Sequence, residues 1–369
     1  MLITHEWIES IGGSENVFRE LLAAFPDAQA GCLWNTVPTT FDRPVWESPL
    51  AHSWLRGRKA LSLPLQPKVW RKYPLGTHEL VLASSHAFGH HVAAHAVREG
   101  RRGLAYVHTP ARYLWAPDVE ARGRAITARF GSPPLRLLDR RTTDPRVSYA
   151  ANSAYIRDRI RASWDQDARV IYPPVDVERI RSVARWRETL LGNEARLIEG
   201  LPRDAFILGA SRLVSYKRLD LAIIIGDALG LPVVIAGAGP DEDLLKHQAA
   251  DARVPVTFTG PVSDAQLYAL YQEASLYVFL ATEDFGIMPV EAMAAGTPVL
   301  VHAVGGAAES VAVTDGGVVV DAREPGRELA QAARRAMALE GTGFAHRTNA
   351  FSRAAFSSQV LEWVRGSKR

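Results

Sequence analysis

Two apolar runs flank the stretch Glu283-Asp-Phe-Gly-Ile-Met-Pro-Val-Glu-Ala-Met-Ala-Ala-Gly-Thr-Pro-Val299, which decides the fold. The run before it, Leu276-Tyr-Val-Phe-Leu280, predicts a buried strand, and the run that begins at Val299 predicts the next strand. Between them, Pro289 suits the first turn of a helix and Gly296 suits its C-terminal cap. A strand, a helix and a second strand in this order predict a parallel α/β sheet, whose ligands bind at the carboxyl ends of the strands.

The same stretch carries candidate binding groups. Glu283 follows the first strand, and the N–H groups after Phe285 and Gly286 begin a helix, where a phosphate can bind. Glu291 lies further along that helix and can accept hydrogen bonds from sugar or ribose hydroxyls. The alternative is that Glu291 only complements the helix dipole and Glu283 is only solvated.

Length and composition predict a two-domain globular protein. A chain of 369 residues exceeds the size of a single core, and 47% hydrophobic with 22% charged residues is ordinary for a folded chain. Cys32 is the only cysteine, which excludes an intramolecular disulfide and a cysteine-rich metal site. The N-terminal sequence shows no signal peptide, and no apolar run approaches the ~20 residues of a membrane span, so we expect a cytoplasmic protein.

Charge is unevenly distributed along the chain. Residues 1–170 contain 23 Lys and Arg against 16 Asp and Glu, a net charge of +7, whereas residues 171–369 contain 20 against 24, a net charge of −4. The N-terminal half is therefore expected to meet an anionic partner, with a solvated basic surface as the alternative.

The order of apolar runs predicts two α/β domains. In the second half, apolar runs at 206–210, 233–236, 256–258, 276–280, 299–301 and 318–320 alternate regularly with helix-like segments, which indicates a doubly wound parallel sheet. The first half shows a looser version, with predicted strands at 2–4, 29–33, 80–83, 104–108, 147–150 and 169–172. The paired prolines of Tyr172-Pro-Pro-Val-Asp176 predict a hinge. We expect an acceptor-binding domain at 1–172, a nucleotide-sugar-binding domain at 173–350 and a terminal helix at 351–369 that packs back on the first domain, with Phe351, Ala355, Leu361 and Trp363 buried. A cleft between the domains is the expected ligand site.

A basic turn follows the first strand of the second domain, in Gly209-Ala-Ser-Arg-Leu-Val-Ser-Tyr-Lys-Arg-Leu-Asp220. Arg212 and Lys217 can neutralise a diphosphate, arginine as a planar fork and lysine as a compact charge. A basic turn by itself is usually solvated. This one belongs to the same predicted sheet edge as Glu283, which favours a shared anionic ligand.

These segments resemble a known family. Arg212-Leu-Val-Ser-Tyr-Lys217, with Glu283 and Glu291 followed by Ala-Met-Ala-Ala-Gly-Thr-Pro-Val, is similar to the retaining glycosyltransferases of family 4, in glycosyltransferase group 1. Their GT-B fold has two Rossmann-like doubly wound domains that face each other across a deep cleft. The likeness extends along most of the chain and is weakest at about residues 35–75. Three further segments resemble the family: Ile11-Gly-Gly-Ser-Glu15, Ile235-Ala-Gly-Ala-Gly-Pro240 and Phe258-Thr-Gly-Pro-Val262.

The resemblance implies a role for each of these groups. Arg212 and Lys217 would hold the donor diphosphate, and Glu291 would bind the ribose hydroxyls. Glu283 would contact the transferred sugar, as an orienting or stabilising group. The segment Phe285, Gly286 and Ile287 would bind the donor through amides that replace water as the leaving group gains charge.

A segment of the first domain narrows the subclass. Tyr106-Val-His-Thr-Pro-Ala-Arg-Tyr-Leu-Trp115 resembles the corresponding segment of the family's bacterial polysaccharide mannosyltransferases. His108 would then hydrogen-bond the donor sugar, with either protonation state open, and Arg112 would help to bind phosphate or acceptor. A packing role for His108 is the alternative.

Glycines and metal-like patterns complete the candidate site. Gly12 and Gly13 allow a loop to lie against the donor, with an ordinary tight turn as the alternative. The glycines at 237 and 239 lack the third glycine of a dinucleotide fingerprint, which disfavours NAD. The histidines at 86, 90, 91 and 95 have no completing carboxylate motif, so no metal and no cofactor other than the nucleotide-sugar donor is expected.

Basic and aromatic residues bracket an apolar stretch of the first domain. Arg56-Gly-Arg-Lys59 and Lys68-Val-Trp-Arg-Lys-Tyr73 can rest on an anionic membrane or grip a lipid-linked diphosphate acceptor, with a solvated loop as the alternative. No nucleic-acid recognition module accompanies them, so nucleic acid is not an expected partner.

Together these features predict a cytoplasmic retaining hexosyltransferase, peripheral at the inner face of the plasma membrane if the basic segment binds there. The expected donor is GDP-mannose, and the expected acceptor is a glycan or a lipid-linked glycan in cell-surface polysaccharide or glycolipid assembly. The alternatives are a family-4 transferase with a UDP-sugar donor and a non-catalytic nucleotide-sugar-binding protein.

Overall fold

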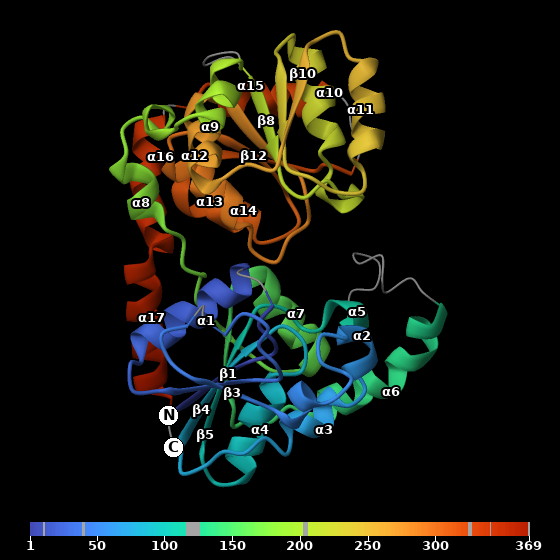
Figure 1. Ribbon diagram of the computed structural model, residues 1–369, viewed down its shortest axis with the longest axis vertical. Helices are drawn as coiled ribbons and strands as arrows, with labels where there is room; N and C mark the ends of the chain where they lie inside the picture. The colour runs from blue at the N-terminus through green and yellow to red at the C-terminus, as the bar shows by residue number, and fades with distance from the viewer. Residues whose placement is uncertain are drawn as a thin grey trace. The chain divides into compact units, whose positions relative to one another are not determined.

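The computed structural model describes residues 1–9, 12–38, 41–115, 126–201, 206–323, 327–339 and 341–367, with 126–132 and 341–342 described by their backbone. The chain divides into two compact units (Figure 1). Unit 1 comprises Met1–Pro174 with Arg353–Arg369, and unit 2 comprises Val175–Ser352. The chain therefore leaves unit 1, forms unit 2 and returns to unit 1 with its final helix.

Unit 1 is built on a parallel sheet. Its described residues form seven strands in the order β3-β2-β1-β4-β5-β6-β7. The strands are β1 (Leu2–His5), β2 (Gln29–Cys32), β3 (Val45–Glu47), β4 (Leu80–Ser85), β5 (Arg102–Val107), β6 (Ser148–Ala151) and β7 (Arg169–Val170). From β1 the chain first builds outward to β3 and then returns to place β4 on the other side of β1, so the winding direction reverses between β1 and β4.

Unit 2 repeats the same plan. Its described residues form six parallel strands in the order β10-β9-β8-β11-β12-β13, so the winding reverses between β8 and β11. The strands are β8 (Ile207–Ala210), β9 (Val233–Ala236), β10 (Val256–Gly260), β11 (Leu276–Phe279), β12 (Val299–His302) and β13 (Gly317–Val320).

Helices cover both faces of each sheet. Those of unit 1 are α1 (Gly13–Ala24), α2 (Lys59–Ser62), α3 (Gln66–Trp70), α4 (His90–Arg98), α5 (Arg112–Trp115), α6 (Ile126–Thr142), α7 (Ala154–Trp164) and α17 (Arg353–Gly366). Those of unit 2 are α8 (Val177–Ser182), α9 (Asn193–Glu199), α10 (Asp220–Leu229), α11 (Glu242–Ala250), α12 (Asp264–Glu273), α13 (Ile287–Ala294), α14 (Ala307–Thr314), α15 (Arg327–Met337) and α16 (Gly341–Arg347). Short 3₁₀ turns lie at Pro49–His52, Trp186–Thr189, Ser215–Lys217 (η5) and Thr348–Phe351 (η6).

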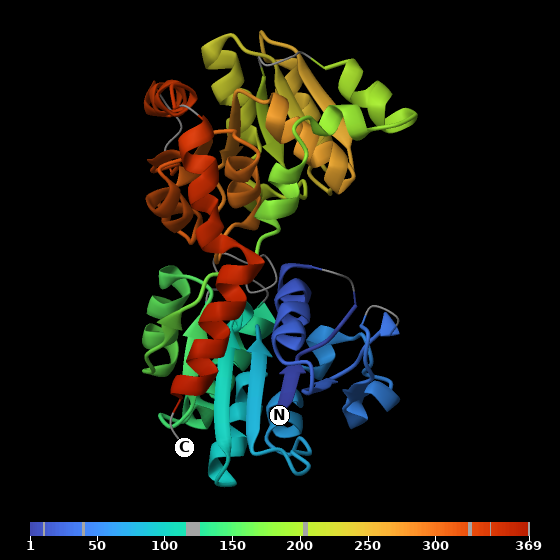
Figure 2. The same cartoon turned by 90° about the vertical axis from the view of Figure 1, so that its left-hand side faces the viewer.

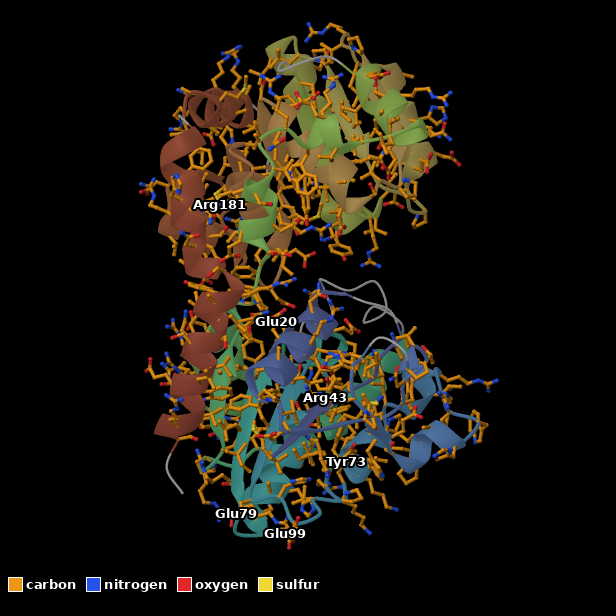
Figure 3. All side chains as sticks on the ribbon, turned by 60° about the vertical axis from the view of Figure 1, so that its left-hand side comes forward. Glu20, Arg43, Tyr73, Glu79, Glu99 and Arg181 are labelled. Atoms are coloured by element: carbon orange, nitrogen blue, oxygen red, sulfur yellow. The ribbon has the colours of Figure 1, made fainter. Side chains whose placement is uncertain are left out.

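Strand alternation separates two apolar clusters in unit 1. Leu82 and Leu104 face a cluster that includes α1 and α17, while Val81 and Ala105 face a cluster that includes α4. The terminal helix α17 lies along the unit 1 sheet (Figure 2). It also pairs with α1, because Arg353 Nε lies 3.4 Å from an oxygen of Glu20, which Figure 3 labels.

The doubly wound fold predicted from the sequence is confirmed, and most predicted strands lie within one or two residues of their observed positions. The edge strand β3 was not predicted, because Val45-Trp-Glu47 is too short to form an apolar run. In the terminal segment Ala355 and Leu361 are only half-buried, so their predicted burial is wrong. The buried face of α17 consists of Phe356, Val360, Trp363 and Val364.

In the described residues, no helix is both long and apolar enough to span a bilayer.

Candidate functional site

The carboxyl edge of the unit 2 sheet brings two candidate segments together. The turn after β8 carries Arg212 and Lys217, and the loop after β11 carries Glu283. Because β8 and β11 are neighbours, with the winding reversed between them, this edge is a topological switch point. The diverging connections of an open α/β sheet leave a crevice at such a point, and ligands bind there.

Lys217 and Glu283 form an ion pair at this edge. Lys217 Nζ lies 2.6 Å from Glu283 Oε1, and both side chains are mostly buried. Lys217 Nζ also lies 5.5 Å from the centroid of the Phe279 ring, a cation–π contact that limits where the ammonium can go. The sequence predicted both residues as ligand contacts, and the structure adds that they contact each other.

Arg212 is the exposed cation of the same turn. Its guanidinium donates to Tyr216 Oη at 2.9 Å. The turn is held from behind by Gly237, whose φ is +128° and where a Cβ atom would lie 1.9 Å from the carbonyl oxygen of Ser211. The glycines after β9 thus serve close packing of two backbone turns, and this positions Arg212 at the sheet edge.

The loop after β11 ends in the N-terminus of α13. Gly286 precedes this helix with φ of +93°, so the amides of Gly286 and Ile287 open the helix as predicted. The Phe285 side chain is buried and its ring centroid lies 5.6 Å from that of Phe351. Phe285 can therefore contact a ligand at this edge only through its backbone.

Two glycines that the sequence analysis did not single out shape the Glu283 loop. Gly306 N–H donates to the carbonyl oxygen of Glu283 at 2.9 Å. At Gly305, where φ is +121°, a Cβ atom would lie 2.7 Å from the same oxygen. The pair Gly305-Gly306 lies between β12 and α14, and its position after a predicted strand is the signal that marks it.

Glu291 lies on α13 in a mostly apolar setting. Burial, and then the negative charge of Asp264, raise the pKa of its carboxyl to about 7. The nearest hydroxyl is Tyr271 Oη, 3.5 Å from Glu291 Oε2, which is too long for a strong hydrogen bond. The carboxylate is therefore an acceptor with unused capacity, as a group that binds ribose hydroxyls requires.

In unit 1, the switch point lies between β1 and β4, and the Gly12-Gly13 loop follows β1. Gly12 caps α1: its N–H donates to Glu15 Oε2 at 3.2 Å, and a Cβ atom there would lie 2.9 Å from that oxygen. Ile11, which belongs to the same predicted motif, is outside the described residues. The loop is thus tied to Glu15, a carboxylate that the sequence analysis did not assign.

His108 lies just beyond β5 and is buried. Its Nε2 lies 2.8 Å from Ser84 Oγ, and the same hydroxyl lies 3.0 Å from His5 Nδ1. His5 Nε2 in turn lies 4.0 Å from Glu15. This chain of side chains joins His108 to the Gly12 loop through residues that pair in register on adjacent strands, His5 with Ser84.

Burial keeps these imidazoles neutral. Burial, and then the neighbouring His86, lower the pKa of His108 to about 3. Burial also lowers the pKa of His5 well below its usual range, with His86 and His108 adding to the effect. The His108 ring is therefore neutral near pH 7.

Comparison with known proteins adds the family. A family model described as "Glycosyl transferases group 1" matches residues 194–355. This part of the chain is similar to the group 1 glycosyl transferases. The matched residues include the whole switch-point site of unit 2, from Arg212 to Glu291.

Two curated proteins that are similar to this chain come from mycobacteria. A GDP-mannose-dependent alpha-(1-6)-phosphatidylinositol monomannoside mannosyltransferase of Mycobacterium tuberculosis is 29% identical over 257 residues, which cover 63% of this chain and 66% of the relative. A D-inositol 3-phosphate glycosyltransferase of Mycolicibacterium smegmatis is 35% identical over 170 residues, or 42% of this chain and 37% of the relative. The chain thus spans less than two thirds of the length of these relatives.

Solved structures that are similar to this chain show its fold. Anabaena HepE in complex with UDP and glucose has a TM-score of 0.68 at 19% identity, with 99% of each chain covered. Sucrose-phosphate synthase from Thermosynechococcus elongatus has a TM-score of 0.70 at 18% identity, covering 99% of this chain and 98% of the other. The predicted GT-B fold is confirmed.

A second histidine cluster, in unit 1, surrounds Asp139. Its Oδ1 lies 2.9 Å from His91 Nε2 and 3.1 Å from His90 Nε2, and its Oδ2 accepts from the indole N–H groups of Trp115 and Trp164, both at 2.8 Å. His90 and His91 are buried, and Asp139 on α6 supplies a carboxylate that no sequence motif placed beside them.

The Asp139 cluster has the residue types of a metal site, but a structural role explains it more simply. Its two histidines and one carboxylate lie close enough to share an ion. However, an ionised carboxylate with N–H groups directed at both oxygens is already satisfied, and adding a divalent cation would leave a net positive charge beside two indole rings. We therefore interpret the cluster as structural.

Arg112 begins α5, where it is half-buried. On the same helix Trp115 donates to Asp139, which fits the packing role expected for Trp115. The candidate groups thus fall into two sets: Gly12, Gly13, His108 and Arg112 in unit 1, and the switch-point residues in unit 2.

Proposed function

We propose that the chain is a retaining glycosyltransferase that uses a nucleotide-sugar donor, with GDP-mannose as the preferred donor. The proposed acceptor is a glycan or a lipid-linked glycan of cell-surface polysaccharide or glycolipid assembly. The observation that carries the proposal is the Lys217–Glu283 ion pair at the switch point of unit 2, beside the N-terminus of α13. The match of residues 194–355 to the group 1 model and the similarity to a mannosyltransferase support it.

The donor diphosphate is assigned to the cations of the β8 turn. Arg212 is exposed and can approach the phosphates as a fork, while Lys217 offers a compact charge already directed toward the edge. The amides of Gly286 and Ile287 add fixed donors at a helix N-terminus. As the bond between sugar and phosphate breaks, the leaving diphosphate gains negative charge, which these preorganised groups stabilise.

The sugar and the ribose are assigned to carboxylates and to His108. Glu291 would accept hydrogen bonds from the ribose hydroxyls, and Glu283, oriented by Lys217, would accept hydrogen bonds from the sugar. His108, neutral and fixed by Ser84, would hydrogen-bond the same sugar. Retention of configuration rests on the family resemblance alone, and Glu283 is proposed as an orienting or stabilising group.

A donor-by-acceptor screen tests the proposal. Binding of GDP-mannose, UDP-glucose, UDP-N-acetylglucosamine and GDP is measured first by calorimetry, and transfer and product linkage are then measured with glycan and lipid-linked acceptors. We expect GDP-mannose to bind most tightly and to be consumed. Preference for a uridine donor would replace the mannose assignment. Tight binding without hydrolysis or transfer would favour a nucleotide-sugar-binding protein.

The proposed location is the cytoplasm. The chain's single cysteine, Cys32, is a free and buried thiol, which is typical of a reducing compartment.

A further inference from the structure

One segment of unit 1 has a charge pattern that the donor site does not use. Residues 48–78 contain six Lys and Arg and no Asp or Glu, whereas the whole chain contains 43 basic and 40 acidic residues. The segment includes α2 and α3, which lie on the outside of unit 1 in Figures 1 and 2. We call residues 54–72 the basic lobe.

Large apolar side chains of the basic lobe point into solvent. Trp54 is 68% exposed, Leu61 57% and Leu65 45%. The same segment also supplies core residues, since Leu55 and Trp70 are buried. The fold therefore divides the apolar residues of this segment into a buried inner set and an exposed outer set.

The cations of the basic lobe are sorted in the same way. Lys59 Nζ lies 2.7 Å from Glu9 and Arg56 lies 3.5 Å from Glu47, so these two charges are compensated within unit 1. Four further cations are exposed, and the structure shows no carboxylate partner for them among the described residues; they are Arg58, Lys68, Arg71 and Lys72.

Trp54 and Arg58 show that an exposed apolar side chain and an exposed cation of the basic lobe contact each other. The Arg58 guanidinium lies 5.5 Å from the centroid of the exposed indole. An indole and a guanidinium side by side combine an apolar surface with a positive charge, which suits the boundary between lipid headgroups and acyl chains. Uncompensated lysines and arginines on the same lobe suit anionic headgroups.

We propose that the basic lobe is a docking surface for an anionic lipid bilayer. Trp54, Leu61 and Leu65 enter the headgroup boundary, and the four uncompensated cations contact lipid phosphates. A nucleic acid would use the cations but has no use for exposed leucines, and a protein partner would need a correspondingly acidic surface; the bilayer uses both sets of residues. The proposal is independent of the donor and of catalysis.

Vesicle co-sedimentation of the full chain tests the docking surface. We expect binding to phosphatidylcholine vesicles that contain about 30% phosphatidylglycerol, and little binding to pure phosphatidylcholine. Binding should weaken as salt is raised, because headgroup attraction is screened. Equal binding to both vesicles, or none to either, would contradict the proposal.

Variants assign the binding to the basic lobe. Combining Lys68→Gln, Arg71→Gln and Lys72→Gln should weaken vesicle binding about a hundredfold, at about fivefold for each charge removed near the surface. Trp54→Ala should weaken binding severalfold at both low and high salt, since its contribution is apolar. The matched control combines Arg334→Gln and Arg335→Gln on α15, two exposed arginines of unit 2 that should leave binding within twofold.

Two further measurements separate docking from folding and from other polyanions. Donor affinity and thermal unfolding of the triple variant should match the wild type, because none of its three residues is buried or belongs to the donor site. Loss of vesicle binding in the α15 control to the same extent would refute the assignment. So would tighter binding of single-stranded RNA than of anionic vesicles through the same three cations.

Discussion

At the scale of single residues, His108 owes its chemistry to its neighbours. Ser84 Oγ lies 2.8 Å from its Nε2, and burial lowers its pKa to about 3. The ring is therefore a neutral hydrogen-bonding group over the physiological pH range. Its orientation depends on Ser84, which belongs to a different strand.

Replacing His108 and Ser84 should separate contact from positioning. We expect His108→Ala to lower kcat about a hundredfold with little change in donor KM, as removal of one preorganised donor does. Ser84→Ala should lower kcat about tenfold, because the imidazole stays but loses its orientation. Steady-state kinetics with the preferred donor checks both expectations.

Ser85→Ala is the matched control for Ser84. Ser85 is an equally buried serine on the same strand, but its hydroxyl donates to Glu6 and accepts from the His90 N–H. Ser85→Ala should therefore lower the free energy of unfolding about as much as Ser84→Ala does, but it should leave kcat within about twofold of the wild type. Equal losses of kcat in the two serine variants would contradict a positioning role for Ser84.

Glu291 should make donor binding depend on pH. Its carboxyl is raised to a pKa of about 7, so it is mostly protonated at pH 6 and mostly ionised at pH 8. Because only the ionised form accepts hydrogen bonds from two hydroxyls, donor affinity should rise about tenfold across this interval. Calorimetric titration of the preferred nucleotide sugar at several pH values measures the change.

Glu291→Gln should remove that pH dependence and raise stability. The pKa of Glu291 in the folded state lies above its ordinary value of 4.5, so folding favours the protonated carboxyl. The contribution of this group to stability is therefore greatest below pH 4.5 and declines as pH rises through about 7. The glutamine variant escapes this decline and should gain about 1–2 kcal/mol in its free energy of unfolding at pH 8. An unchanged pH dependence of donor affinity would show that Glu291 does not contact the donor.

At the scale of elements, Asp139 connects four helices of unit 1. It lies on α6 and meets His90 and His91 of α4, Trp115 of α5 and Trp164 of α7. Burial, and then the neighbouring His90, lower the pKa of His91 to about 4, while the N–H groups around Asp139 hold the pKa of its carboxyl below its usual range. Packing of these helices thus depends on a neutral His91 beside an ionised Asp139.

Unit 1 should therefore lose stability on mild acidification. Between pH 6.5 and 4 the unfolded chain protonates His91 while the folded unit does not, so stability falls as pH falls. His91 alone should cost about 2 kcal/mol between pH 7.5 and 5. His91→Gln, which keeps a donor for Asp139, should reduce the loss by that amount in denaturant titrations, and an identical pH profile in both proteins would contradict this account.

At the scale of the whole molecule, each unit has its own core. The clusters of unit 1 draw on residues from both ends of the chain, including Trp363 of α17, whose indole donates to Ser148 Oγ at 2.8 Å. The cluster of unit 2 is built from its own strands and helices. Unfolding is therefore expected to show two transitions.

Calorimetry of tryptophan variants checks this division. Trp363→Ala should destabilise the unit 1 transition by about 3–5 kcal/mol and leave the other unchanged. Trp186→Ala, a buried tryptophan of unit 2, is the matched control and should do the reverse. Donor at a hundred times its Kd should stabilise unit 2 by about 2.7 kcal/mol. One common transition, shifted equally by both variants, would contradict independent cores.

The amino-acid sequence by itself determined the two doubly wound sheets and the residues at their carboxyl edges. Apolar runs, prolines and glycines act within a few residues of where they stand, so strands such as Val233–Ala236 and the helix after Gly286 were readable directly. Arg212, Lys217 and Glu283 were found for the same reason, because each follows a predicted strand.

Only the tertiary structure decided which of these groups meet. Lys217 and Glu283 are 66 residues apart and pair because β8 and β11 become neighbours where the winding reverses. The link from His5 through Ser84 to His108 likewise needs three adjacent strands in register. Side-chain contacts of this kind depend on strand order, which no local pattern encodes, and the burial that follows from them sets the pKa values of His108 and Glu291.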